Sequence, residues 1–428
     1  MFERIAELAI RRSRLVLIVA VVAVALAGAL GAGAFGVLKG GGYDDPASES
    51  TRAARLIGER FGGETNLILL VRAPEGDVDT PAADKGGRAL AADLKKDPAV
   101  KNVVSYWETG SPGLRSKDGR EAMILAHVKG DANELEKNAK TLIAEYTGAY
   151  GGGLTVRAGG GTAVTADLTT QVPKDLLLAE AIAVPLTLVL LLLVFGSVVA
   201  ALLPLAIAVV AIAGTFAELA LIGGVADVST SATNLTTALG LGLGIDYALL
   251  MTSRFREQLA TGASVEDAVR HTVRTAGRTV AFSAATVAVA LAALLVFPQY
   301  FLRSFGYAGV GVVAIAAVST LFVMPALFVV LGHRVNSGRL PWAGKTRGTA
   351  PVWGRLAATV MRRPALTALP VLAVLLVMVS PLLGLTLGTP DERVLPEDAP
   401  SRQVATALRE EFEGNDDAAI QIVLDRAV

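Results

Sequence analysis

Seven long apolar segments constrain this chain more than any other feature of its sequence. Each has about 20 residues or more, which is the length that a helix needs to cross the hydrocarbon core of a bilayer. A backbone in lipid must satisfy its hydrogen bonds internally, so the sequence predicts an α-helical membrane protein with about seven transmembrane helices. The segments are Leu15–Leu38, Leu176–Phe195, Val198–Gly223, Ala232–Thr252, Thr279–Phe297, Ser304–Leu331 and Ala365–Leu387.

Composition narrows the functional class. Only 18% of residues are charged, and the 39 basic residues balance the 39 acidic ones, so no net charge indicates nucleic acid as a partner. The chain has no cysteine, which excludes disulfides, thiolate metal sites and cysteine nucleophiles. We find no nucleophile elbow, metal-ligand cluster or phosphate-binding loop, and therefore predict no enzyme activity, no metal and no cofactor.

Basic residues predict the orientation of the spans. They concentrate in the N-terminal segment, in residues 253–278 and in residues 332–363. With seven alternating spans these segments all fall on one side, and an excess of Lys and Arg marks that side as cytoplasmic. The first apolar segment is longer than the core of a cleaved signal, so we interpret it as a retained anchor. We expect a multi-pass protein of the cell membrane, with a cytoplasmic N-terminus and residues 39–175 outside.

Residues 39–175 have the size and pattern of a folded domain. Helical and strand patterns alternate in the order α-β-α-β-β-α-β, which fits a split βαβ, ferredoxin-like sandwich. We interpret His127, on a predicted strand, as structural. The predicted elements are Ser50–Phe61, Asn66–Val71, Pro81–Lys96, Val100–Trp107, Ala122–Val128, Asn133–Tyr146 and Leu154–Arg157.

The start and the end of the chain match each other at a constant offset of 351 residues. Arg11-Arg12 matches Arg362-Arg363 ahead of an apolar span, and Leu69 and Val71 match Ile420 and Ile422. Between them, Ser50, Ala54, Glu59, Phe61 and Gly63 match Ser401, Ala405, Glu410, Phe412 and Gly414. The seventh span therefore begins a second copy of the same unit. Its single strand lacks partners, so we expect this tail to be poorly ordered.

The repeat completes the predicted organisation of the chain. We expect the first half of a two-fold pseudo-symmetric transporter, followed by the opening of its second half. Residues 1–38 are the cytoplasmic N-terminus and first span, and 39–175 are the external domain. Residues 176–331 are a five-helix bundle, 332–364 a basic cytoplasmic linker, 365–388 the seventh span, and 389–428 the start of a second external domain.

Asp246 is an acidic residue in an otherwise apolar, glycine-rich span. A carboxylate there is costly unless it pairs, titrates or lines a water-filled path. A low dielectric favours its protonated form, so its protonation can follow a proton gradient. The alternative is a structural carboxylate that stays neutral and bonds a neighbouring helix. Tyr247 can donate to this carboxylate or simply pack at the interface.

Further residues are weaker candidates for the same site. Gly240 and Gly244 have the spacing that lets helices approach closely, and Gly242 precedes Asp246 by one turn; we expect all three to serve helix packing. Candidates for support of a proton relay are Glu218, Asn234, Ser283 and Thr286. For Ser283 and Thr286 the competing interpretation is a hydrogen bond to a carbonyl of their own helix.

Four motifs resemble the MMPL family (mycobacterial membrane protein large) of the resistance-nodulation-division superfamily. They are Gly240–Tyr247 with Ser253–Glu257, Phe301–Gly306 leading to Met324–Leu327, Phe195–Ser197, and Gly58–Gly62. The resemblance implies an exporter with twelve spans and two porter domains, driven by protons and acting on lipids and other amphiphiles. It implies a proton relay at Asp246 and Tyr247, and a matching pair near position 597, past this sequence. Residues 176–331 also resemble a sterol-sensing-type bundle.

The leading hypothesis is therefore proton-driven export of hydrophobic or amphiphilic molecules. The expected partners are membrane lipids, such a substrate, protons, and a second half-transporter or a further copy of the chain. Two alternatives are a non-transporting, sterol-sensing-type scaffold and an inactive half-transporter that needs a partner chain.

Overall fold

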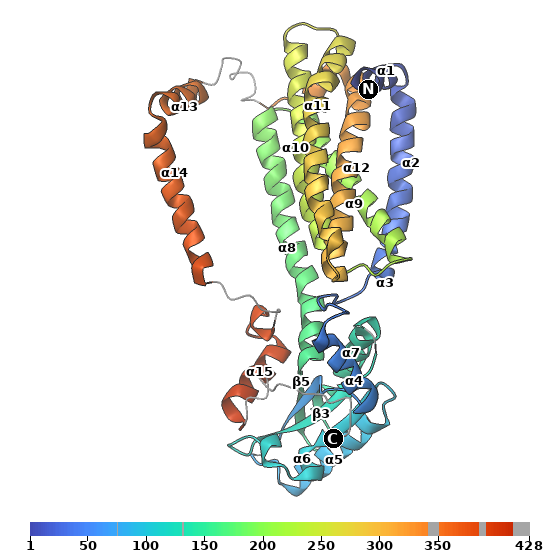
Figure 1. The fold of residues 1–428 in the computed structure, drawn as a ribbon, viewed down its shortest axis with the longest axis vertical. Coiled ribbons are helices and arrows are strands. Elements are labelled where there is room, and N and C mark those ends of the chain that lie inside the picture. Colours follow the sequence, from blue (N-terminus) through green and yellow to red (C-terminus); the bar gives the residue numbers. More distant parts are fainter. Residues whose placement is uncertain (75, 131, 341–350, 385–390, 414–428) are drawn as a thin grey trace.

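The chain forms a helical bundle at one end and a small sheet domain at the other (Figure 1). The computed structural model describes residues 1–74, 76–130, 132–340, 351–384 and 391–413. Seven helical segments in this part are long and apolar enough to cross a membrane, which confirms the predicted number. They are Ser13–Ala32, Gly161–Phe195, Val198–Gly223, Ala232–Ala260, Val265–Val296, Tyr300–Asn336 and Pro364–Gly384.

Five of these segments pack into one bundle around α12 (Tyr300–Leu331). Helix α12 contacts α2 (Ser13–Ala32), α9 (Val198–Gly223), α10 (Ala232–Ala260) and α11 (Val265–Ala292), and η2 (Ala293–Val296) extends α11. The rings of Phe255 and Phe328 stack in its core with centroids 4.3 Å apart. The amphipathic helix α1 (Phe2–Arg11) buries one face against α11 and α12.

We expected the basic segment 253–278 to be a loop between two spans, but most of it is helical. Helix α10 continues to Ala260 and α11 begins at Val265, so that only residues 261–264 join them. The Ser264 hydroxyl accepts a hydrogen bond from the Asp267 backbone N–H (3.1 Å) and caps α11. Hydropathy marked where the apolar segments end, whereas both helices continue beyond them. This turn and α1 lie at the end of the bundle opposite the sheet domain (Figure 1).

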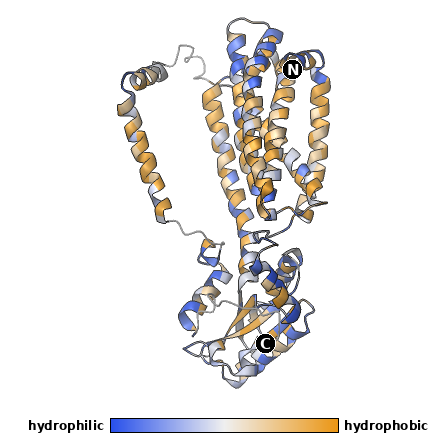
Figure 2. Cartoon of the chain, viewed as in Figure 1, coloured by the Kyte–Doolittle hydropathy of each residue, from blue (hydrophilic) through white to orange (hydrophobic). Residues whose placement is uncertain are grey.

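Helix α8 (Gly161–Phe195) connects the sheet domain to the bundle without a break. Its 35 residues span about 52 Å, and the boundary expected at residue 175 falls inside it. Ala163 and Ala166 are buried at one end, and Leu191 and Phe195 at the other. Figure 2 shows its surface changing from mixed to apolar as it enters the bundle. Pro173 and Pro185 each remove one helical hydrogen bond, so bending of α8 is easiest there.

The turn at Phe195–Ser197 ties α8 and α9 to the far end of α12. Gly196 ends α8 in the left-handed region (φ 60°), and the Ser197 hydroxyl accepts a bond from the Ala200 N–H (3.4 Å). The same hydroxyl is 2.7 Å from the Ser337 carbonyl, beyond η3 (Gly332–Asn336). Arg256 lies over the Phe195 ring, 5.5 Å from its centroid. This motif therefore fixes helix ends.

The sheet domain, residues 39–160, holds a five-stranded sheet in the order β2-β3-β1-β5-β4, with every neighbouring pair antiparallel. The strands are β1 (Leu67–Arg72), β2 (Val100–Ser105), β3 (Glu121–Val128), β4 (Gly148–Tyr150) and β5 (Leu154–Gly159). The predicted strands match β1, β2, β3 and β5. The short edge strand β4 was not predicted, because three residues with two small side chains give no alternating pattern.

The helices of this domain follow the sequence pattern closely. They are α4 (Glu49–Arg60), α5 (Pro81–Lys96), α6 (Tyr106–Thr109) with η1 (Pro112–Leu114), and α7 (Ala132–Tyr146); α3 (Ala34–Val37) precedes them. Leu67 and Leu69 face α5 and α7, where they meet Leu90, Leu94 and Leu142. Ile68 and Leu70 point to the opposite face of the sheet.

That opposite face is covered by the C-terminal helix α15 (Pro400–Glu411) (Figure 1). The expectation of a poorly ordered tail is therefore wrong for residues 391–413, because α15 finds an apolar surface on the first sheet. The strand expected around Ile420 and Ile422 lies outside the described residues. Between bundle and tail, α13 (Pro351–Arg362) leads to α14 (Pro364–Val379) and η4 (Ser380–Gly384), while η5 (Glu392–Val394) precedes α15. Helix α14 buries none of its residues.

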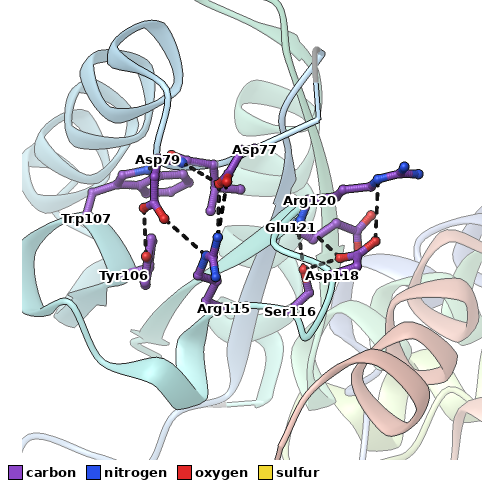
Figure 3. A network of polar contacts seen from close by, with 10 residues as sticks. Asp77, Asp79, Tyr106, Trp107, Arg115, Ser116, Asp118, Arg120 and Glu121 are labelled. Atoms are coloured by element: carbon purple, nitrogen blue, oxygen red, sulfur yellow. Dashed lines mark hydrogen bonds and ion pairs between the residues drawn. The ribbon is translucent and has the colours of Figure 1, made fainter.

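Polar contacts fix the irregular connections at the far end of the sheet domain (Figure 3). Arg115 donates to Asp77 (3.1 Å) and pairs with Asp79 (3.2 Å), which also accepts from the Tyr106 hydroxyl (2.7 Å). The Asp79 N–H and the Arg115 guanidinium lower the pKa of the Asp77 carboxyl. The Trp107 indole donates to the Val78 carbonyl (2.9 Å). The loop after β1 and the connection from β2 to β3 are thereby joined.

Glu121 is the most buried carboxylate of this domain that the structure describes. It is 2% exposed and accepts from Arg157 at 2.8 Å, while its Oε2 atom has no hydrogen-bond partner in the described residues. Burial raises the pKa of Glu121, Arg157 opposes that rise, and Glu411 near α15's end adds to it. The pKa of this carboxyl is thus higher in the folded than in the unfolded protein, so its protonation stabilises the fold at low pH.

We expect the Glu121 contribution to be present below the ordinary glutamate pKa of 4.5 and to be lost as pH rises through the raised value. In Glu121→Gln, the melting temperature of the sheet domain should therefore fall less between pH 4 and pH 7 than in the unmodified chain. Trp107 fluorescence reports this unfolding once Trp342 and Trp353 are replaced by Phe. The exposed Glu64→Gln is the matched control, and an equal pH dependence in both variants would contradict the assignment.

Candidate functional site

Helix α10 approaches α9 closely because two of its residues are glycine. A Cβ atom at Gly240 would lie 2.5 Å from Ile212, and one at Gly244 would lie 2.7 Å from the Cα atom of Ala208. These contacts also define an antiparallel register between the two helices. Gly242 is different, because nothing lies within 4 Å of the position of its Cβ. Gly240 and Gly244 thus serve the packing of α10, and Gly242 leaves space beside Asp246.

Asp246 lies on an open face of the bundle. Ala238, Gly242 and Asp246 are spaced four residues apart on α10 and are all exposed. On the neighbouring α11, Phe282 is 65% exposed and Val289 is 72% exposed. The carboxylate therefore stands at the depth of an apolar span with no protein over it in the described residues. Such a group needs protein or water to cover it in a bilayer.

Tyr247 points the other way, into the bundle. It is 5% exposed, and its hydroxyl is buried without a hydrogen bond of ordinary geometry among the described residues. Ser283 of α11 and the Asp246 carboxylate are close enough to act on it electrostatically. Two helices thus bring three polar side chains together, with an unsatisfied hydroxyl among them.

Glu218 is a second unpartnered carboxylate, located elsewhere in the bundle. Its Oε2 atom is buried without a hydrogen-bond partner in the described part of the chain, and a Cβ at Gly311 of α12 would overlap it. The register of α9 and α10 puts Glu218 at the level of Asn234, three helical turns or about 18 Å from Asp246. Glu218 therefore does not contact Asp246.

The remaining candidates do not reach this group of side chains. The Thr286 hydroxyl donates its proton to the Phe282 carbonyl of its own helix at 2.9 Å, as the competing interpretation predicted. Asn234 is half-buried in the first turn of α10, about 18 Å from Asp246, and its backbone carbonyl accepts from the Thr237 hydroxyl at 3.1 Å. Ser283 alone among the supporting candidates lies beside Tyr247.

The motif Phe301–Gly306 lies at the start of α12, within a cluster of aromatic side chains whose contacts the sequence did not reveal. Phe301 packs on Tyr43 and on Phe305, each with ring centroids 4.6 Å apart, and the Tyr300 hydroxyl donates to the Gly40 carbonyl. Ser304 accepts from the Ser229 N–H at 2.8 Å. The aromatic residues at positions 43, 300, 301 and 305 were the signal in the sequence from which this cluster could have been predicted. This motif anchors the segment between α3 and the sheet domain.

The described residues contain no group of three or more His, Asp or Glu side chains that could hold a metal ion. What the site offers instead is one carboxylate and two hydroxyls on adjacent apolar helices, with the carboxylate on their open side. These groups can bind, release and pass on a proton. A bundle of long apolar helices with a sheet domain on a continuous helix defines a multi-pass membrane protein.

The MMPL family model matches residues 42–367, and the chain belongs to this family. A membrane protein of Streptomyces coelicolor is 37% identical over 96% of this chain and 58% of its own length. The trehalose monomycolate exporter MmpL3 of Mycolicibacterium smegmatis is 32% identical over 95% of this chain and 44% of its own length. The mycolic acid-containing lipids exporter MmpL11 of the same organism is 28% identical over 83% of this chain and 38% of its own length. The chain thus spans about half the length of these relatives.

Proposed function

We propose that this chain is part of a proton-driven exporter of lipids or other amphiphiles in the cytoplasmic membrane. The observation that carries the proposal is the combination of Asp246, Tyr247 and Ser283 on adjacent helices in a bundle of apolar spans. Relatives named as lipid exporters support the substrate class. The N-terminus and the turn between α10 and α11 face the cytoplasm in this proposal, and the sheet domain lies outside.

Asp246 is the residue that binds the transported proton, and Tyr247 is its hydrogen-bond partner. When the carboxylate is ionised, the unsatisfied Tyr247 hydroxyl donates to it and lowers the cost of the charge in a medium of low dielectric. When the carboxyl is protonated, the Tyr247 hydroxyl turns back to its buried place beside Ser283. Binding and release of one proton thus change the contacts between α10 and α11.

The open face of α10 is covered by a second set of helices in the complete transporter. Asp246 is exposed in the described residues, and an ionised carboxylate is costly at that depth against lipid. The sheet domain is a porter domain of ferredoxin-like type, which its strand order supports because β1 lies between β3 and β5. The continuous helix α8 transmits movements of the bundle to it.

The proposal is tested with the protein purified from its native membrane and reconstituted into vesicles that contain a fluorescent lipid. We expect the initial rate of lipid movement to increase at least tenfold when a pH gradient is imposed, because the gradient is the energy source. Collapsing the gradient with a protonophore should return the rate to that of empty vesicles. A rate that is independent of the gradient would contradict proton coupling, and no lipid movement at all would contradict the substrate class.

A further inference from the structure

Arg256 on α10 is a cationic side chain that the structure holds in place without a counter-charge. Its Nε–H donates to the Asn336 side-chain oxygen at 2.7 Å, and its guanidinium lies over the Phe195 ring. The side chain is half-buried. Its acidic neighbour in the sequence, Glu257, pairs instead with Arg254 at 2.8 Å. Among the described residues, Arg256 therefore has neighbours that orient it but none that neutralises it.

A second arginine, Arg339, lies beside the first. It follows η3 and forms an isolated β-bridge with Ser197, in the turn between α8 and α9. The next residue, Leu340, donates its N–H to the Gly196 carbonyl at 3.1 Å. The backbone of Arg339 is thus fixed on the same turn that Arg256 covers. The charge of Arg339 is close enough to that of Arg256 for the two to repel each other.

Two neighbouring guanidinium groups of this kind fit an anion. Neither Arg256 nor Arg339 forms an ion pair in the described part of the chain, and their mutual repulsion is unfavourable. Arginine has five N–H donors, and the bond to Asn336 uses one of those of Arg256. Guanidinium groups bind phosphate oxygens through paired, charge-assisted hydrogen bonds. A phosphate group would therefore offset the repulsion and bind both side chains.

The surface next to the two arginines is apolar, which indicates where the rest of the ligand lies. Helix α8 ends at Phe195, whose ring lies under Arg256. The last turns of α8 carry apolar side chains that are each more than half exposed, namely Leu186, Leu190, Leu193 and Val194. Their spacing places them on one side of the helix. An apolar surface that leads to a basic site has the polarity of a phospholipid, with the acyl chains along the helix and the phosphate at its end.

We propose that Arg256 and Arg339 bind the phosphate group of an anionic phospholipid, whose acyl chains lie along the exposed side of α8. The site lies at the end of the bundle opposite the sheet domain (Figure 1), which faces the inner leaflet in the proposed orientation. The bound lipid bridges α8, α10 and the segment after η3, and thereby stabilises this end of the bundle. Arg256 is about 15 Å from Asp246 along α10, so the lipid binds apart from the proposed proton relay and does not require transport.

Lipid binding to the purified full chain tests this proposal. Protein in detergent, stripped of lipid, is titrated with dioleoylphosphatidylglycerol, and the bound lipid is counted by native mass spectrometry. We expect Arg256→Gln and Arg339→Gln each to raise the Kd of the most tightly bound lipid by about tenfold or more, because each loses a charge-assisted contact to phosphate. Arg254→Gln is the matched control, since it removes an arginine that is paired with Glu257, and it should bind lipid as the unmodified chain does. Equal binding by all three variants would overturn the proposal.

The melting temperature distinguishes a binding role of Arg339 from a purely structural one. Without lipid, Arg339→Gln should melt at or above the temperature of the unmodified protein, because the substitution removes the repulsion with Arg256. Added phosphatidylglycerol should raise the melting temperature of the unmodified protein by several degrees and that of the variant much less. A variant that melts lower without lipid and gains as much from lipid would contradict the binding role.

Inorganic phosphate distinguishes a lipid ligand from a dissolved anion. At the concentration used for the lipid, it should leave the melting temperature of the unmodified protein unchanged, because it lacks the acyl chains that contact α8. Stabilisation by inorganic phosphate as large as that by phosphatidylglycerol would overturn the assignment to a phospholipid.

Discussion

Replacing Asp246 with Asn is expected to abolish gradient-driven lipid transport. Asparagine keeps the size of the side chain and removes the proton-binding group. At a membrane potential of 100 mV one transported proton supplies about 2.3 kcal/mol, which corresponds to roughly a 50-fold difference in lipid concentration. Loss of that proton should reduce the accumulation ratio by this factor, as measured in vesicles with an imposed gradient.

Two controls separate this effect from misfolding. Asp246→Glu retains a carboxyl group on the open face of α10 and should keep part of the activity. Asp175→Asn removes an exposed carboxylate that accepts a hydrogen bond from Gln171 on α8, and should leave transport unchanged. Full gradient-driven accumulation in Asp246→Asn would show that another group binds the proton.

The second large effect is expected from Gly244→Leu. The added side chain would collide with the backbone of Ala208, which cannot move without separating α9 from α10. Overpacking of this kind costs about 1–3 kcal/mol, and a contact with backbone belongs at the upper end of that range. The melting temperature of the purified chain in detergent should fall by several degrees.

Gly242→Leu is the matched control, because it places the same side chain two residues away where the structure leaves open space. Leucine favours a helix over glycine by about 0.8 kcal/mol. The control should therefore melt at the same temperature as the unmodified chain or slightly higher. Equal losses in both variants would show that α10 does not pack on α9 through Gly244.

Much of the fold could be predicted because it depends on local periodicity. The seven spans follow from apolar length, and α5 begins at Pro81 and ends at Lys96 as its pattern predicts. The extension of α10 and α11 past the apolar segments could not be predicted in this way, since hydropathy measures burial in lipid and not helix length. For the same reason, hydropathy did not indicate that α8 continues without a break through residue 175.

The candidate site was predictable in part. The cost of a buried charge singled out Asp246, but which side of α10 it occupies depends on how Gly240 and Gly244 pack. Whether Glu218 contacts Asp246 depends on helix register, which the sequence of one helix does not contain. The place of α15 on the first sheet depends on two surfaces that are far apart in sequence. Long-range packing decided each of these points.

Proton movement measured together with lipid movement shows whether this protein couples the two and whether Asp246 carries the proton. A pH-sensitive dye inside reconstituted vesicles reports protons that cross when a lipid gradient is imposed in the absence of a pH gradient. We expect lipid-dependent proton movement in the unmodified protein and none in Asp246→Asn. Lipid-dependent proton movement of the same size in Asp246→Asn would contradict a role of Asp246 in proton transport.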